Sequence, residues 1–597
     1  MTRGLINWVL LAAVAMAPLC AQDPGGNPEP DGQYEPGRAV ARLSVASGDV
    51  SVRRGDTGDV VAAATNAPIM ADDRVLTSSS SRAEVELDGS NVLRIGPNAE
   101  VRFSALDIHT FQIQIAAGTA TFRTLRPGQA QVEVDTPSVA VRPMRPGAYR
   151  VTVHEDGTSE ITVRVGEAEI DSQRGGEHLE AGQTMQARGP ATDPEYQVVQ
   201  GIPPDSFDRW NDERDRYFQS SQSYQHVNPA IAGGEDLDQN GQWVNDPNYG
   251  QVWQPNVSPN WAPYQNGQWV WEDYYGWTWV SYDPWGWAPY HYGRWFMGAG
   301  GWAWYPGPVG PYPYWAPAYV GFFGYGPGLG IGVGFGFGGV GWVALAPFEV
   351  FHPWWGRGFY GGFGGGVFGA HTVIAGNVNV FNSYRNARVT GGAIGVNTAG
   401  FGHGGQIAAL NRGQLQGASA LHGVVPVAPD RSSLRFSDRA ASGRYPQSRA
   451  QSFAGRMQTT HVQHASFAQQ QRGMQQMSRG NFSPSAGRSS FGGSSSGWSR
   501  FGSPTRSSGG SSYGARGGAT PAYGRSYGSS GGGVRISPQI VQQRGAYSSP
   551  GGSSQPRGFG GARVAPSYGN ARQGSQSAPR APSSGGGHSS GGGGHRR

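Results

Sequence analysis

Lysine is absent from this sequence of 597 residues, so all 46 basic residues are arginine. Cysteine is almost absent as well, because Cys20 is the one cysteine and it stands at the end of an N-terminal apolar run. A chain with one cysteine has no internal disulfide framework and no thiolate metal site, and loss of Cys20 on export would remove the last thiol nucleophile. We therefore expect a fold that packing alone stabilises.

Charged residues are sparse and unevenly placed. They make up 15% of the chain, and residues 401–597 contain 22 Arg against two acids, whereas residues 1–400 contain 24 Arg against 39 acids. An acidic front is thus followed by a basic tail. The arginine fork suits phosphate or carboxylate partners, but we favour the codon bias of a GC-rich genome as the explanation for the absence of lysine.

Long apolar runs are missing apart from the first residues. Arg3 precedes an apolar run from Leu5 to Leu19, and Ala21 precedes Gln22. This pattern is typical of a secretory signal peptide, and the run is short for a membrane span, which needs about 20 residues. We predict cleavage after Ala21 and export to the periplasm, the outer envelope or the exterior. Lipidation of Cys20 is the alternative, and it would attach the protein to a membrane.

Residues 39–200 alternate between apolar and polar positions, after a disordered linker over 22–38. Ala83–Leu87, Phe111–Ile115 and Ile161–Val165 show the alternation most clearly. A period of two indicates half-buried strands, and Asp88-Gly89 and Asp156-Gly157 are turn signals between them. We predict a β-sandwich or β-roll here.

The same segment resembles a FecR-type domain. The resemblance rests on stretches that follow the family's order: Ser47–Val50, Asp73–Thr77, Val85–Ser90, Leu93–Asn98, Ala117-Gly118, Thr136-Pro137, Val165–Glu167 and Leu179–Gln183. The family's best-known members sense siderophore uptake and carry a cytoplasmic anti-sigma segment and a transmembrane helix before this domain. Here a signal peptide stands in that place, so the resemblance implies an exported, protein-binding β-domain.

A helix and linker are predicted over 201–235. Pro203-Pro204 leads in, Asp205 or Ser206 can cap the helix, and Phe207, Trp210 and Tyr217 fall at helical spacing up to Ser220. We expect this helix to pack on a neighbouring domain.

Tryptophan is concentrated in the next segment, 236–425, where 16 of the 19 Trp lie between Trp243 and Trp355. The sequence repeats with a period of 26, and WAPY at 261–264 recurs at 287–290. A looser third copy begins at Gly301. Each copy is predicted to be one β-hairpin, because a repeat is usually one structural unit.

The repeated indoles allow two interpretations. They can form a platform on which sugar rings stack, or they can be the core of a thin sheet rich in Gly and Pro. His291, Tyr292 and Arg294 occur in the second copy alone, so a site confined to one repeat would use them. The candidate ligand-binding residues are Trp261, Tyr264, Trp287, Tyr290, His291, Tyr292 and Arg294.

Residues 240–405 resemble an uncharacterised Trp-rich domain family of exported bacterial proteins, often found behind FecR-like domains. The resemblance extends beyond the repeats to Gly341–Pro347, Glu349, Pro353-Trp354, Asn377–Asn379 and Tyr384–Asn386. It implies no activity. Inside this segment Leu329–Gly338 alternates Gly with apolar residues, which favours a strand over a membrane helix, since each Gly costs a helix about 1 kcal/mol relative to Ala.

A disordered tail rich in Gly, Ser and Arg is predicted over 426–597, because such a composition buries too little surface to offset the entropy of ordering. Arg516–Gly518 resembles the RGG segments of RNA binders, but behind a signal peptide we expect no specific nucleic acid. The expected partners of the tail are polyanions: envelope polymers, lipopolysaccharide or the protein's own acidic front.

No catalytic set is evident. Glu272 and Asp273 lie among the aromatic strands, as the paired acids of glycosidases do, but adjacent residues usually point apart and a hairpin loop explains them. We expect no enzyme, no cofactor and no metal.

The sequence therefore predicts a mainly β, exported, non-enzymatic protein that binds or scaffolds an envelope polysaccharide or protein, with no membrane contact beyond the signal peptide. A FecR-type signalling component without the anti-sigma segment and a glycan-processing enzyme are the alternatives.

Overall fold

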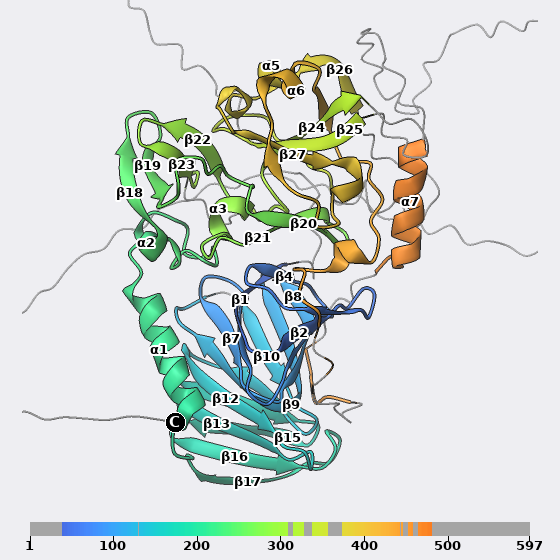
Figure 1. Ribbon diagram of the computed structural model, residues 1–597. Helices are drawn as coiled ribbons and strands as arrows, with labels where there is room; N and C mark the ends of the chain where they lie inside the picture. The colour runs from blue at the N-terminus through green and yellow to red at the C-terminus, as the bar shows by residue number, and fades with distance from the viewer. Residues whose placement is uncertain are drawn as a thin grey trace, which may run out of the picture. The chain divides into compact units, whose positions relative to one another are not determined.

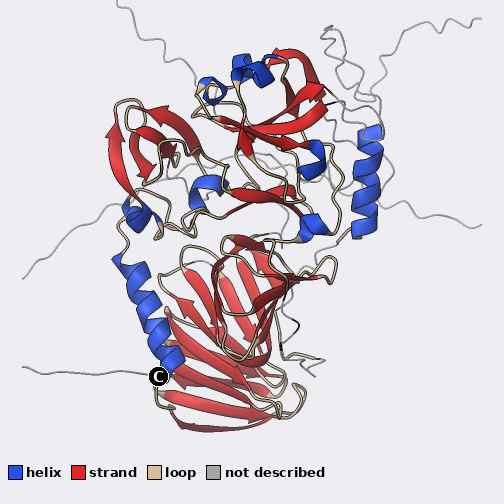
Figure 2. Ribbon diagram, viewed as in Figure 1, coloured by secondary structure: helices blue, strands red, loops and turns tan. Residues whose placement is uncertain are grey.

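The computed structural model describes residues 39–128, 130–308, 314–327, 337–355, 373–441, 443, 445, 452–457 and 464–479. The predicted signal peptide and linker, the Gly-rich stretch 328–336 and the chain after residue 479 lie outside the described residues. Strands dominate the described part (Figure 2), which confirms the prediction of a mainly β fold.

The N-terminal domain is made of two sheets that share one apolar core. Sheet A contains β2 (Val50–Arg53), β3 (Val60–Ala62), β5 (Arg74–Thr77), β8 (Glu100–Asp107), β10 (Gln131–Asp135), β11 (Ala140–Pro143), β14 (Glu167–Ser172) and β15 (Gly175–Glu180). Sheet B contains β1 (Ala41–Ser47), β4 (Ala67–Ile69), β6 (Arg82–Glu86), β7 (Asn91–Ile95), β12 (Gly147–Val153), β13 (Ser159–Val165), β16 (Gln183–Arg188) and β17 (Glu195–Gln200). Figure 1 shows these strands in blue to teal.

One long strand, β9 (Thr110–Thr124), belongs to both sheets. The chain passes from one sheet to the other at Gly118, whose φ is +79°. A Cβ there would lie 2.4 Å from the carbonyl oxygen of Asn98 and 2.5 Å from Cα of Ala99, so glycine is required. Alternate residues are buried in β12, as the period of two predicts, whereas all five residues of β7 are buried. Each buried Val, Ile or Leu contributes about 1.5–3 kcal/mol.

Helix α1 (Ser206–Ser220) is the helix predicted after Pro203. Asp205 caps it, accepting from the backbone amides of Phe207 and Asp208, while the Asp208 carboxylate accepts from the amide of Asp205. Phe207, Trp210 and Phe218 are buried on one face. Arg150 of β12 pairs with Asp208 at 2.7 Å, so α1 is fixed to sheet B by apolar packing and by charge.

The 26-residue period corresponds to three hairpins. They are β18 (Gly241–Asp246) with β19 (Gly250–Pro255), β20 (Gly267–Glu272) with β21 (Gly276–Ser281), and β22 (Arg294–Gly298) with β23 (Gly301–Tyr305). The first and third hairpins pair through Trp253 and Trp304 into a four-stranded sheet, and the middle hairpin forms a separate two-stranded sheet. The two WAPY copies lie in the connections, where the second forms the short helix α3 (Ala288–His291).

A six-stranded sheet follows, built from β24 (Val320–Pro327), β25 (Phe337–Ala344), β26 (Val373–Asn379), β27 (Ala393–Asn397), β28 (Ala408–Ala409) and β29 (Ser419–His422). Glycines face aromatic rings across its strands: Phe323 lies over Gly341, where a Cβ would come within 2.2 Å of the ring. Of the Gly-rich segment Leu329–Gly338, for which a strand is predicted, only Phe337 and Gly338 are described, and they begin β25. Among the described residues, no helix is both long and apolar enough to cross a membrane.

The predicted tail contributes to the folded structure beyond residue 426. Val427, Leu434 and Phe436 are buried, and α7 (Phe467–Arg479) buries Met474. The boundary at 426 is thus too early for the described residues. Val427, Leu434 and Met474 pack in the aromatic core, whereas Phe436 packs in the core of the N-terminal domain.

Candidate functional site

The seven candidate ligand-binding residues lie in or against one aromatic core. Tyr264, Tyr290 and His291 have no exposed surface, Trp287 is 1% exposed and Arg294 is 6% exposed. Trp261 and Tyr292 are half-buried. A sugar platform needs exposed rings, so the expectation of a glycan site on these residues is not met, and the alternative interpretation, a tryptophan core, describes their positions.

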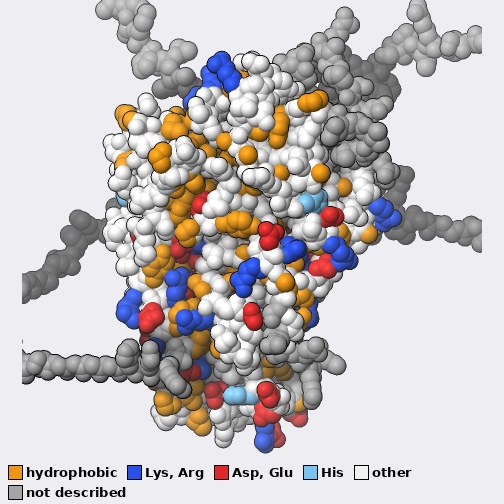
Figure 3. Space-filling model, in the orientation of Figure 1, with side chains coloured by type: hydrophobic (Ala, Val, Ile, Leu, Met, Phe, Trp, Pro, Cys, Tyr) orange, Lys and Arg blue, Asp and Glu red, His pale blue; other side chains and the backbone are white. Residues whose placement is uncertain are grey.

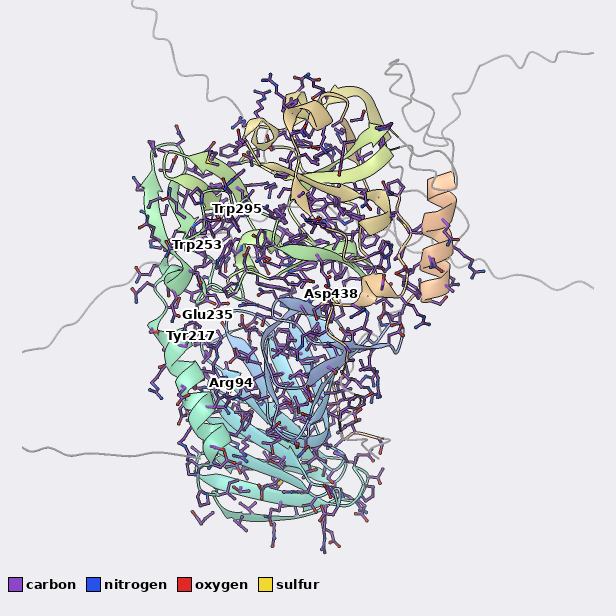
Figure 4. The ribbon with its side chains drawn as sticks, in the orientation of Figure 1. Arg94, Tyr217, Glu235, Trp253, Trp295 and Asp438 are labelled. Atoms are coloured by element: carbon purple, nitrogen blue, oxygen red, sulfur yellow. The ribbon has the colours of Figure 1, made fainter. Side chains whose placement is uncertain are left out.

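The WAPY tyrosines are fixed by hydrogen bonds within that core. The Tyr264 hydroxyl donates to the carbonyl of Tyr290 at 2.8 Å and accepts from the amide of Tyr319 at 2.9 Å. The Tyr290 hydroxyl donates to the Asp283 carboxylate at 2.8 Å. Trp253 and Trp295, labelled in Figure 4, belong to the same cluster. The repeated phrase is therefore a packing unit.

The residues specific to the second copy are also internal. The His291 ring stacks on Trp315 at 5.0 Å and 16°, and its Nδ1 lies 2.7 Å from the carbonyl oxygen of Ala316. Burial lowers the pKa of His291 to about 3, so the ring is neutral at physiological pH. The Arg294 guanidinium lies 4.1 Å from the centre of the Tyr319 ring. Tyr292 accepts a hydrogen bond from Trp304 Nε1 at its carbonyl.

The acids of the middle hairpin lie at the turn between β20 and β21, where the sequence predicts a hairpin loop, and they are buried and paired. Glu272 receives two bonds from Arg54, at 2.8 Å and 2.6 Å, and Arg54 also donates to the carbonyl of Trp271. Burial raises the pKa of Glu272 to about 8 against the attraction of Arg54. Asp73 accepts the amides of Gly55 and Met70. The ion pair between Arg54 and Glu272 joins the middle hairpin to the N-terminal domain.

Asp273 faces a histidine from the far end of the described chain. His464 Nδ1 lies 2.6 Å from the Asp273 carboxylate, and its Nε2 lies 3.4 Å from Asp72. Despite burial, the hydrogen bonds that the protonated ring donates to these two carboxylates raise the pKa of His464 to about 9. A small cavity adjoins these groups. Because each carboxylate already has a cationic or amide partner, the cluster has the character of a structural ion network.

A second charged cluster holds α1 against sheet B, beside Arg94 and Tyr217 in Figure 4. Glu84 is fully buried and accepts from Arg94 Nε at 2.8 Å and from Arg214 at 2.6 Å. The two guanidinium groups outweigh desolvation and lower the pKa of Glu84 to about 2. Sequence reasoning missed this cluster, because a lone polar residue in an alternating strand is usually assigned to the solvent face.

Strand β17 is the most exposed element of the N-terminal domain. All six of its residues are exposed, including the apolar side chains of Tyr196, Val198 and Val199 at 48%, 45% and 36%. Among the described strands it pairs with β16 alone. An edge strand of this kind offers a row of backbone donors and acceptors to another chain.

Comparison with known proteins identifies two families in the chain. Residues 73–169 match the FecR protein family, and residues 234–349 match a family of unknown function, DUF6600. The predicted order, a FecR-type domain followed by an uncharacterised Trp-rich domain, is confirmed. None of the curated proteins matches the chain.

Two solved structures of a candidate anti-sigma factor from Parabacteroides distasonis, at 2.50 Å and 1.65 Å resolution, are similar to part of it. The identities are 18% and 17%, each alignment covers 21% of this chain, and the TM-score is 0.19 in both cases. The chain spans 59% of the length of these structures.

Proposed function

We propose that this protein is an exported, non-enzymatic binding protein of the FecR type that captures an extended segment of another envelope protein at β17. The observation that carries the proposal is the exposed edge of sheet B, with three apolar side chains in solvent. Adding a strand to such an edge supplies main-chain hydrogen bonds, while side chains on alternate positions give specificity. The leader sequence and the FecR match support the extracytoplasmic location.

The positions of the other candidate residues favour a protein ligand over a glycan. The indole rings that would stack on sugars are used in the core, and Glu272 and Asp273, the acids that a glycosidase would need, are paired with Arg54 and His464. Little charge remains on the surface over the aromatic region (Figure 3). Binding through β17 requires neither the rings nor these acids.

The test is a photo-crosslinking residue placed at Tyr196 in the full chain, expressed in the producing bacterium. We expect a defined protein adduct that is lost when Val198→Lys is added, because a charged side chain blocks pairing at an edge strand. Val350, 56% exposed in the aromatic region, is the matched control position. An adduct to glycan alone, or a yield no higher than at Val350, would contradict the proposal. Hydrolysis of peptidoglycan or polysaccharide by the full chain would contradict its non-enzymatic part.

A signalling role is the second candidate, and the FecR match favours it. In that case the captured protein is part of a regulatory system, and deletion of this chain changes transcription that depends on an alternative sigma factor. A reporter for such transcription, compared between the deletion strain and one complemented with Val198→Lys, separates the two roles. Restoration by the variant would show that signalling does not use β17.

A further inference from the structure

A short piece of the arginine-rich tail, Ser452–Met457, lies on sheet A of the N-terminal domain (the orange loop beside β9 and β10 in Figure 1). The amide of Ala454 donates to the carbonyl of Thr136 at 3.0 Å. The amides of Arg456 and Met457 both donate to one carboxylate oxygen of Glu133, at 2.9 Å each. Three successive contacts thus fix the backbone of this extended segment.

The surface beneath the segment is a row of three residues on adjacent strands. Asp135 of β10 pairs with Ala140 of β11, and Ala140 pairs with Asp171 of β14, so a small residue lies between two carboxylates. Ala454 packs on Ala140, and both are buried together with Ala191. The Arg456 guanidinium donates to the Asp171 carboxylate at 3.0 Å. Ala454 therefore meets a partner of matching size, and Arg456 meets one of opposite charge.

Gly455 is the sterically most demanding position. A Cβ there would lie 2.5 Å from Asp135 Oδ2 and 2.6 Å from Gln112 Nε2. Those two atoms are hydrogen-bonded to each other at 2.9 Å, and both side chains are buried, so they cannot withdraw freely. Burial and the neighbouring Glu133 raise the pKa of Asp135 to about 8.

We propose that this row of sheet A is a binding site for an extended Ala-Gly-Arg peptide segment, and that the chain's own Ala454–Arg456 occupies it in cis. The alanine fits over Ala140, the glycine passes Asp135, and the arginine pairs with Asp171. The opposite charges of the two halves of the chain favour this contact. The site is separate from β17, so it goes beyond the binding role proposed above.

The tail contains a second copy of the tripeptide, Ala486-Gly487-Arg488, which lies outside the described residues. A site that recognises three residues would accept this copy as well, and the segment covalently nearest to the site has the advantage of effective concentration. The acidic front of the chain is then a partner of its own basic tail, one of the alternatives that the charge division suggested.

The first experiment measures hydrogen exchange of the full chain at the amides of Ala454, Arg456 and Met457. Replacing Gly455 by Ala is expected to speed their exchange about tenfold or more, because charge-assisted hydrogen bonds are lost. Gly443→Ala is the matched control, since Gly443 precedes an arginine in the same tail and a Cβ there meets nothing within 4 Å. Arg456→Gln provides a second variant without added bulk. Wild-type amides that exchange as fast as those of the Gly455→Ala chain would overturn the proposal.

The second experiment titrates a labelled Ser452–Met457 peptide into the full chains. We expect tight binding to a chain that carries both Gly455→Ala and Gly487→Ala, in which neither cis copy fits the site, and at least about tenfold weaker binding to wild type, where the cis segments compete. A peptide covering 485–490 should displace the label. Failure of the label to bind the doubly substituted chain, or equal binding of a scrambled peptide of the same composition, would overturn the site.

Discussion

Replacing Glu84 by Gln removes one charge from the cluster that joins α1 to sheet B. Glu84 and Arg94 have no exposed surface, and Arg214 is 19% exposed, so the remaining guanidinium groups would stay buried beside a neutral amide. A pKa of about 2 against an ordinary 4.5 corresponds to about 3 kcal/mol of stabilisation at 1.36 kcal/mol per pH unit. Breaking a buried ion pair by removing one partner costs about 3–5 kcal/mol. The two routes agree, and we expect a loss of about 3 kcal/mol.

The assay is denaturant unfolding of the full chain at several pH values, followed by near-UV circular dichroism. Because the folded pKa lies below the unfolded one, the contribution of Glu84 is fully present above about pH 4.5 and is lost as the pH falls through about 2. The difference between wild type and Glu84→Gln should therefore shrink on acidification. Glu213→Gln, exposed on the same helix, is the control and should have little effect. A loss below about 1 kcal/mol at pH 7, or a difference independent of pH, would refute the reasoning.

Three further changes probe the aromatic region and its charged junction. Trp287→Ala should lower the free energy of unfolding by about 3–5 kcal/mol, because it leaves a cavity in the core. The control is Tyr314→Ala, which should leave the Tm nearly unchanged because Tyr314 is 49% exposed. Equal Tm values for the two variants would contradict the packing role of Trp287. The His291→Phe variant should lose less stability than wild type as the pH falls from about 6.5 to about 3, because the core disfavours the protonated histidine of the wild type. Parallel curves of Tm against pH for the two proteins over that range would contradict this prediction. His464→Gln should be destabilising below about pH 6.5, and the effect should disappear as the pH rises through about 9, where the wild-type histidine loses its charge. A pH-independent effect of His464→Gln in thermal melts would remove the ion pair from the explanation.

The sequence predicts the individual strands and hairpins of this protein better than it predicts which of them contact one another. The period of two predicts the strands of the N-terminal domain, and the period of 26 predicts the first two hairpins, because both patterns lie in neighbouring residues. The third copy is expected to begin at Gly301, but the third hairpin begins with β22 at Arg294. The pairing of Trp253 with Trp304 joins the first hairpin to the third, and no local signal distinguishes it from a sheet of consecutive hairpins.

The candidate site failed for a related reason. From the sequence alone, a polar residue such as Arg54 or Glu272 is expected to face solvent. The two residues are 218 apart in the chain, and their burial is evident only in the structure, where they pair with each other. His291 likewise reads as exposed until Trp287 and Trp315 enclose its ring. The composition of the tail correctly indicated low burial on average but concealed Phe436 and Met474, which are buried individually.

The hydrogen-bond partners of the middle hairpin, β20–β21, lie both before and after it in the sequence, so they are synthesised at different times. Arg54 and Asn66, which bond to Glu272 and to the carbonyl of Asp283, precede the hairpin and are already made when it is synthesised. The groups that accept hydrogen bonds from its indoles come later in the sequence. They are the carbonyl of Val427 for Trp277 and the side-chain oxygen Oε1 of Gln470 for Trp271, 150 and 199 residues downstream. The indoles of Trp271 and Trp277 therefore complete these hydrogen bonds only after residues 427–470 have been synthesised.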